Sequence, residues 1–107
     1  MNTLSQREEQ IMLAVWTLKD DAYLVAIKKY LSDIIGKKWT VGAIHKPLRR
    51  LEQFGFLETY LGEVTAVRGG RAKKIYRITK RGLVVLTRYK KITKTLWADF
   101  PGFDFND

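Results

Sequence analysis

The basic side chains of this chain are concentrated in one stretch, and the chemistry they offer is the binding of anionic groups. Residues 64–98 hold eleven Lys or Arg and no Asp or Glu, whereas the other 72 residues hold nine Lys or Arg and eleven acids. The net charge of +9 therefore comes from this segment alone. Within it, RGGRAKK (68–74) places a glycine pair between two arginines. This concentration of charge indicates a polyanionic partner, and we expect double-stranded DNA.

Other kinds of site chemistry have little support in the residue types. The chain has no Cys and one His, His45, so a thiolate nucleophile or a metal centre of His and Cys ligands cannot be assembled. No glycine-rich loop follows a strand and opens a helix in the order that phosphate-binding loops require. We therefore expect no enzymatic activity, no metal and no cofactor.

Length and composition are those of one folded domain. The chain has 107 residues, of which 46% are apolar and 29% charged. Its apolar runs are too short to span a membrane, and the first residues lack the layout of a signal peptide, so we expect a cytoplasmic protein. The net charge of +9 suits a nucleic-acid binder and also a protein that touches an anionic membrane surface.

The first two helices can be predicted from their caps and from the period of their apolar residues. Ser5 and Glu8 have the spacing of a capping box, and the apolar residues that follow recur on one helical face up to Asp20. A second helix is expected from Ala22–Ile35, with Gly36 as a left-handed terminus. Its expected buried face consists of Tyr23, Ile27, Leu31 and Ile34.

A third helix is expected between Thr40, as its cap, and Gly55, as its stop. Pro47 would remove a backbone hydrogen bond from the middle of this helix, so we expect a bent or late-starting helix. The expected buried stripe consists of Val41, Ile44, Leu48 and Leu51.

The pattern then changes to that of a β-hairpin followed by a last helix. Residues 57–61 alternate between apolar and polar as in a half-exposed strand, and residues 75–78 supply the return strand. Gly69-Gly70 is the expected tip of the hairpin, and Thr79 the cap of the last helix. The expected apolar stripe of that helix consists of Val85, Tyr89, Ile92 and Leu96.

This order of elements predicts a mostly α protein with a small β-hairpin, a winged helix-turn-helix. We expect a single domain over residues 1–107, divided into a winged helix-turn-helix at 4–78, a C-terminal dimerisation helix at 79–98 and a tail at 99–107. In this architecture the third helix enters the major groove of DNA, and the hairpin lies over a neighbouring minor groove or the backbone.

Three stretches resemble the smaller members of the PadR-type transcriptional regulators. They are REEQIMLAVWTL (7–18), VGAIHKPLRRLEQFGFL (41–57) and GGRAKKIYRITKRG (69–82), and the resemblance spans roughly residues 4 to 98. Winged helices in general do not share this Gly-Arg tip at this spacing from Thr79-x-x-Gly82. The resemblance implies a dimeric repressor in which the first and last helices build the dimer. Some family members also bind aromatic or cationic small molecules between the two subunits.

Two sets of residues are candidates for contact with DNA. Arg can grip guanine with two hydrogen bonds, whereas Lys and Thr more often hold phosphates. The alternatives are a solvated helix face for the first set and a hairpin that serves only solubility for the second. The set on the third helix consists of Thr40, His45, Lys46, Arg49 and Arg50. The set on the hairpin consists of Arg68, Gly69, Gly70, Arg71, Lys73 and Lys74.

The dimer interface is expected to use apolar residues of the first and last helices. Trp97 and Trp16 are candidates for an aromatic wall at this interface, against a flat, aromatic or cationic effector. The alternative for Trp97 is dimer packing or anchoring of the tail, and the alternative for Trp16 is packing of the first helix, in the core or at the dimer interface. The expected interface residues are Ile11, Val15, Leu86, Tyr89, Ile92 and Leu96.

Taken together, these patterns favour a sequence-specific DNA-binding transcriptional regulator, with a homodimeric repressor as the expected form and relief by a small-molecule effector as an open option. Two alternatives remain at this stage. One is a sequence-independent nucleic-acid binder, which the charge pattern serves equally well. The other is a winged-helix interaction module whose basic face contacts an anionic membrane or an acidic protein.

Overall fold

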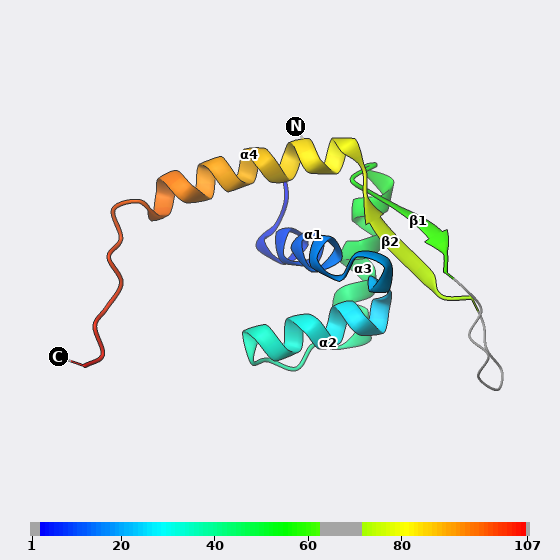
Figure 1. The fold of residues 1–107 in the computed structure, drawn as a ribbon, viewed down its shortest axis with the longest axis horizontal. Helices are drawn as coiled ribbons and strands as arrows, with labels where there is room; N and C mark the ends of the chain where they lie inside the picture. Colours follow the sequence, from blue (N-terminus) through cyan, green and yellow to red (C-terminus); the bar gives the residue numbers. More distant parts are fainter. Residues whose placement is uncertain (1–2, 63–71, 107) are drawn as a thin grey trace.

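The computed structural model describes residues 3–62 and 72–106, and they form a three-helix body, a hairpin and a long last helix (Figure 1). The expected mostly α fold with a small β-hairpin is confirmed. The elements are α1 (Gln6–Leu18), a 3₁₀ turn (Lys19–Asp21), α2 (Leu24–Ile35), α3 (Val41–Gln53), β1 (Leu57–Leu61), β2 (Lys74–Ile78) and α4 (Lys80–Trp97).

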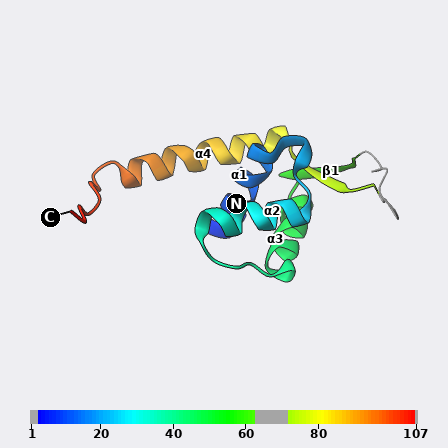
Figure 2. The ribbon, with the colours of Figure 1, turned by 60° about the horizontal axis from the view of Figure 1, so that its bottom comes forward.

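The hairpin and α4 project in opposite directions from the three-helix body. β1 and β2 pair antiparallel, in a register that runs from Leu57 opposite Ile78 to Leu61 opposite Lys74. The first part of α4 packs on the body, and its C-terminal half continues beyond the body, as both ribbon views show (Figures 1 and 2). The hairpin and the free end of α4 are therefore the two extremities of the molecule.

Local sequence signals account for the helix ends. Ser5 and Glu8 form the expected capping box, and the side chains of Thr40 and Thr79 accept hydrogen bonds from the amides of the first turns of α3 and α4. Gly36 ends α2 in the left-handed conformation, with φ of 75°. All four of these predictions are confirmed.

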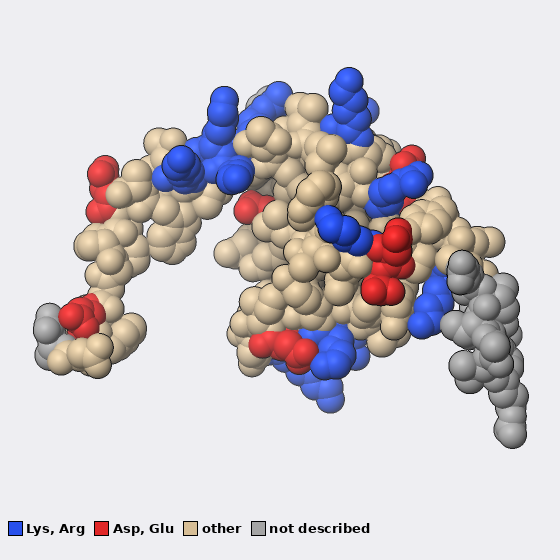
Figure 3. Space-filling model, in the orientation of Figure 1, with Lys and Arg blue, Asp and Glu red and all other residues tan. Residues whose placement is uncertain are grey.

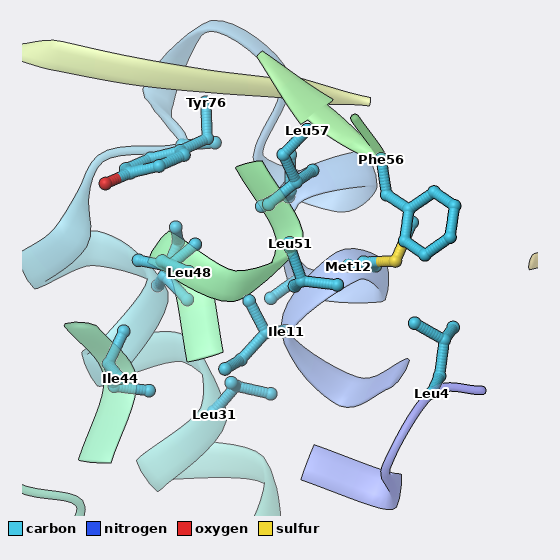
Figure 4. Packing of buried hydrophobic residues seen from close by; sticks show 14 of the residues in the cluster. Leu4, Ile11, Met12, Leu31, Ile44, Leu48, Leu51, Phe56, Leu57 and Tyr76 are labelled. Atoms are coloured by element: carbon cyan, nitrogen blue, oxygen red, sulfur yellow. The ribbon is translucent and has the colours of Figure 1, made fainter. Parts of the chain in front are cut away.

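The core lies where the three helices meet the base of the hairpin. Ile11, Met12, Ile27, Ile44, Leu48 and Leu51 are its largest fully buried side chains. Figure 4 shows Leu51 of α3 between Ile11 and Leu57, with Met12 of α1 against Phe56. One continuous apolar cluster therefore fixes α3 and the hairpin to the same body.

The start of α2 and the course of α3 differ from the predictions. α2 begins at Leu24 because the Ala22 carbonyl accepts a hydrogen bond from the Tyr76 amide at 2.8 Å, which ties this segment to β2. α3 runs from Val41 through Pro47, so of the two predicted alternatives, a bend and a late start, the late start was wrong. The fully buried Ile44 and Leu48, on either side of the proline, hold the helix in place despite the missing hydrogen bond.

Some residues of the predicted buried stripes are exposed in the structure, so the buried part of each stripe is shorter than predicted. Ile34 at the end of α2 and Val41 at the start of α3 are 63% and 49% exposed. On α4, Val85 is buried, whereas Ile92 and Leu96 are 47% and 77% exposed, because this part of the helix lies beyond the body. In the described parts of the chain, no helix is long and apolar enough to cross a membrane.

Candidate nucleic-acid interface

The exposed face of α3 carries basic side chains opposite its buried stripe. Ile44, Leu48 and Leu51 are fully buried, and the helical period then leaves four predicted contact residues in water. These exposed residues are His45, Lys46, Arg49 and Arg50. Thr40, the fifth predicted residue on this helix, is exposed too, but its hydroxyl accepts from the Ala43 amide at 3.1 Å and so serves as the cap.

A groove of about 530 Å³ runs between this face and the beginning of α1. Its basic lining comes from Arg7 of α1 and from Lys46, Arg49 and Arg50 of α3. Arg7 also lies over the ring of the buried Trp39, with its guanidinium carbon 4.9 Å from the centroid. The basic surface therefore extends from α3 onto α1. Arg7 was not among the predicted contact residues, because the sequence of α1 indicated only a cap and a buried apolar face.

Arg50 has a second role that the sequence did not reveal. Its Nε lies 3.4 Å from Oε2 of Glu8, whose side chain is only 3% exposed, and its guanidinium stacks over the Phe54 ring. The other oxygen of Glu8 accepts from the Ser5 amide at 2.8 Å. Arg50 thus balances a buried carboxylate at the start of α1.

Arg49 and Lys46 differ from Arg50 in this respect. Among the described residues, neither takes part in an ion pair, and both are exposed. Their charges are therefore directed to solvent, which makes them the residues of α3 best placed to meet an anionic partner.

A second hollow, of about 370 Å³, joins α3 to the base of the hairpin. His45, Arg49 and Lys74 contribute to its lining, and Lys74 Nζ lies 3.2 Å from Oε1 of Glu52. Desolvation lowers the pKa of Lys74, but its hydrogen bond to Glu52 and the nearby acidic groups outweigh that effect and raise the pKa overall. The ammonium therefore keeps its charge and fastens β2 to α3.

The remaining hairpin residues divide into a described part and an undescribed part. Lys73 lies with its Nζ 4.0 Å from the centre of the Tyr23 ring, which places it against the start of α2. Arg68, Gly69, Gly70 and Arg71 lie outside the described residues, so their predicted contacts stay predictions.

α4 carries a row of basic side chains along its length. Figure 3 shows Lys and Arg side chains gathered on the part of the surface that α4 forms. All of the Lys and Arg residues on the helix are exposed, namely Lys80, Arg81, Arg88, Lys90, Lys91 and Lys94. This charge lies outside the α3 surface and needs a separate explanation.

Two of the predicted dimer residues require correction. Ile11 and Val15 are 0% and 2% exposed in the core of their own protomer, so they cannot contact a second copy. The face of α1 that is open to a partner carries Leu13 and Trp16 instead, which are 48% and 53% exposed. The apolar stripe in the sequence correctly identified the buried face of α1. A dimer interface, however, would have to use the adjacent face of this helix, which is exposed.

The four predicted interface residues on α4 divide into two groups. Leu86 and Tyr89 pack against the protomer's own core, and the Tyr89 hydroxyl accepts from the Leu4 amide at 2.7 Å. Ile92 and Leu96 are exposed and remain available to a partner.

The two candidate ligand tryptophans lie in different surroundings. Trp16 lines an open groove of about 680 Å³ between α1 and α4. Trp97 is not part of that lining and pairs with Phe100, with ring centroids 5.6 Å apart. The two rings do not share a groove within one protomer, and the aromatic wall predicted at a dimer interface stays a prediction. Within residues 3–62 and 72–106, no three His, Asp or Glu side chains come together as metal ligands.

Three helices, a β-hairpin and an exposed basic face on the third helix together define a winged helix-turn-helix protein. The chain is similar to a PadR family transcriptional regulator from Eggerthella lenta, at 28% identity and a TM-score of 0.66, over 86% of this chain and 78% of that one. It is similar to a PadR-like transcription factor from Bacteroides fragilis, at 26% identity and a TM-score of 0.66, over 83% and 81% of the two chains. RosR from H. salinarum shares the fold at 20% identity and a TM-score of 0.67, over 92% and 81%.

These similarities confirm the resemblance to PadR-type regulators that the sequence motifs indicate. No protein-family model matches the chain, and no curated protein sequence matches it. The similar structures are transcriptional regulators, a class without enzymatic activity, in agreement with the residue types of this chain.

Proposed function

We propose that the chain is a sequence-specific, double-stranded DNA-binding transcriptional regulator that acts as a homodimeric repressor. The observation that carries the proposal is the exposed face of α3, where Lys46 and Arg49 point to solvent beside the groove that α3 shares with α1. A helix that presents Arg and Lys on one face, while its other face is anchored in the core, is suited to the major groove.

The surroundings of α3 support this assignment. Arg7 extends the basic surface on one side, and Lys74, held to Glu52, extends it toward the hairpin on the other. Phosphate contacts from such flanking residues position a reading helix, whereas contacts to base edges from the helix itself supply specificity. We assign residues 4–78 to DNA binding and residues 79–98 to dimerisation.

Exposed apolar residues on α1 and α4 support the homodimer part of the proposal. Leu13, Trp16, Ile92 and Leu96 are all exposed in the single protomer, and large apolar side chains left in water favour a partner that covers them. A two-fold dimer would present two copies of α3 to half-sites roughly 34–36 Å apart, one helical turn of DNA.

Selection of bound duplexes from a random library tests the proposal. We expect a palindromic consensus with half-sites spaced by about one turn, bound at least about 1,000-fold more tightly than random DNA. Enrichment of no consensus, with equal affinity for all duplexes, would replace the proposal with a sequence-independent nucleic-acid binder. Anionic vesicles and random DNA, compared at the same salt, test the interaction-module alternative.

A small-molecule effector that relieves repression has its own test. Trp16 is exposed in the α1–α4 groove of the single protomer, so a planar aromatic cation that enters this groove, in competition with any dimer contact there, would quench its fluorescence. We expect quenching that saturates with the concentration of the compound. The same compound should also weaken the binding of the protein to its operator. A panel of such compounds without any quenching argues against an effector at this position.

A further inference from the structure

The groove between α1 and α4 is open, and none of the elements that the structure describes in the same protomer covers it. It has a volume of about 680 Å³ and an apolar lining that includes Leu13, Trp16, Leu83 and Leu86. Leu13, Trp16 and Leu83 are 48%, 53% and 40% exposed. Apolar surface gathered in one groove favours an occupant with apolar side chains of its own.

The C-terminal tail carries large apolar side chains that are not buried in its own protomer. Phe100, Phe103 and Phe105 are 61%, 74% and 89% exposed, and every described residue from 94 onward is exposed. Their aromatic pairs are local among the described residues, with Phe100 against Trp97 at the end of α4 and Phe103 against Phe105 at 5.1 Å between centroids. Three phenylalanines within six residues are thus left without a core.

The charges of the groove and the tail are complementary. Residues 80–97 of α4 include six Lys or Arg and no acid. Lys90 and Lys94 of this helix line the groove, and one acid, Glu9 of α1, lines its other side, so the charged lining is basic on the α4 side. Residues 98–107 include three Asp and no Lys or Arg. Figure 3 shows the basic side chains along α4 and acidic side chains at the far end of the tail. Opposite charges of this kind steer an association and fix its register.

We propose that the tail of one subunit, residues 99–106, packs into the α1–α4 groove of a second copy of this chain. Its phenylalanine rings would cover Leu13, Trp16 and Leu83, while Asp99 and Asp104 would face Lys90 and Lys94. The inference rests on the homodimer proposed above and names the segment that would cover the α1–α4 groove in that dimer. In a two-fold dimer the exchange occurs twice, once in each direction.

The geometry favours a second copy over the tail's own groove. The C-terminal half of α4 carries the tail away from the three-helix body (Figures 1 and 2). To reach its own groove, the tail would have to reverse fully and run back along α4 toward Leu83. Residues 99–106 span at most about 26–29 Å when extended, which is enough to lie along the α4 of an adjacent antiparallel subunit.

Disulfide trapping between two single-cysteine chains tests the exchange directly, because the natural sequence has no cysteine. Phe103→Cys is placed in one chain and Leu13→Cys in a second chain with a size tag. We expect mild oxidation to join the two chains in at least tenfold higher yield than the matched pair Phe103→Cys with Lys37→Cys, whose cysteine lies outside the groove. Equal yields from the two pairs would overturn the proposal.

A chain that carries both Phe103→Cys and Leu13→Cys separates the two possible grooves. Cross-links between chains support the exchange, whereas a fast, concentration-independent cross-link within one chain would show that the tail folds back on its own protomer and overturn it.

The dimer dissociation constant gives a second readout, measured by analytical ultracentrifugation. Phe103→Asp should raise it by about tenfold or more, since the ring loses its burial, whereas Asn106→Asp, which adds the same charge beside the aromatic segment, should change it less than twofold. A monomeric wild-type protein would sink the homodimer itself and this inference with it. A wild-type dimer with an unchanged constant for Phe103→Asp would overturn the tail exchange alone.

Discussion

The hydroxyl of Thr79 donates a hydrogen bond to the carbonyl of Gly55 at 2.6 Å and so joins the start of α4 to the end of α3. Gly55 follows α3 in the left-handed conformation, with φ of 76°. The same hydroxyl accepts from the Gly82 amide at 3.0 Å, and the Thr79 amide donates to the Phe56 carbonyl at 3.1 Å. The proposed reading helix and the proposed dimer helix are therefore fastened together at one point.

Replacement of Thr79 tests the strength of this junction. Thr79→Val keeps the shape of the side chain but removes both hydroxyl bonds, so we expect a loss of about 1–2 kcal/mol in the free energy of unfolding. Urea denaturation followed by circular dichroism measures it. Thr79→Ser keeps the hydroxyl and is the control, and equal stability of the two variants would show that the hydroxyl contributes nothing.

Gly82 is required at this junction because the start of α4 lies too close to Phe56, the residue before β1, and to Ile78 at the end of β2 for a side chain. A Cβ at position 82 would lie 2.3 Å from the Phe56 carbonyl oxygen and 2.8 Å from Cγ2 of Ile78. Gly82→Ala must shift backbone, so we expect a loss of about 1–3 kcal/mol in thermal or urea unfolding.

Gly42 provides the matched control for that substitution. It is also helical, but a Cβ there meets nothing within 4 Å. Gly42→Ala should leave stability unchanged or raise it by up to about 1 kcal/mol, because alanine has the higher helix propensity. A similar loss in both variants would mean that the close approach of α4 to Phe56 and Ile78 is not what excludes alanine at position 82.

Arg49 and Arg50 are adjacent, but we expect their removal to have different effects. Arg49→Ala should weaken operator binding by about tenfold or more and leave stability within about 0.5 kcal/mol, because its charge has no ion-pair partner among the described residues. Arg50→Ala leaves the buried Glu8 carboxylate without its cation and should cost about 1 kcal/mol of stability, a modest value since Arg50 is half exposed.

Gel-shift titration measures the operator affinity of both variants, and urea denaturation measures their stability. Wild-type operator affinity of Arg49→Ala at moderate salt would refute the proposed surface. Unchanged stability of Arg50→Ala would show that water, rather than the guanidinium, satisfies Glu8.

The salt dependence of DNA binding reports how many phosphates the protein neutralises. If a dimer neutralises five to eight phosphates, the slope of log affinity against log salt should be roughly −5 to −7. Lys46→Ala should weaken binding similarly for all sequences and make the slope shallower by about one unit for each phosphate that the variant leaves without its lysine. Titrations at several salt concentrations measure it, and an identical slope would place Lys46 away from the phosphates.

The buried tyrosine of β2 predicts a loss of stability at alkaline pH. Burial raises the pKa of Tyr76 above 10.0, although the nearby Lys74 ammonium acts in the opposite direction. As pH rises past about 10, the phenol loses its proton in the unfolded chain before it does so in the folded chain, so the free energy of unfolding falls. Below that pH the phenol is protonated in both states and adds no pH dependence to the free energy of unfolding. Tyr76→Phe should therefore show a shallower decline between about pH 9.5 and 11.5 in urea denaturation, and parallel curves would contradict this.

The elements and most of their ends could be predicted from the sequence because their causes are local, whereas the start of α2 depends on a hydrogen bond to the distant β2. Capping at Ser5, Thr40 and Thr79, and the glycine terminus at Gly36, depend on residues within one turn of each helix. The segregation of charge into residues 64–98 is likewise a property of composition, and it indicated an anionic partner before any fold was known.

The roles of individual residues depended on contacts between distant parts of the chain. Helical period shows that Ile11 and Val15 share a face, but only the packing of α2 and α3 against that face excludes them from an interface and leaves Leu13 and Trp16 open. Arg50 and Arg49 read alike as sequence, and only the position of Glu8, 42 residues earlier, separates a structural cation from one that is directed to solvent. Residue type and spacing thus determined the helices, the hairpin and the sign of the partner's charge, whereas tertiary packing decided which side chains are left exposed to meet it.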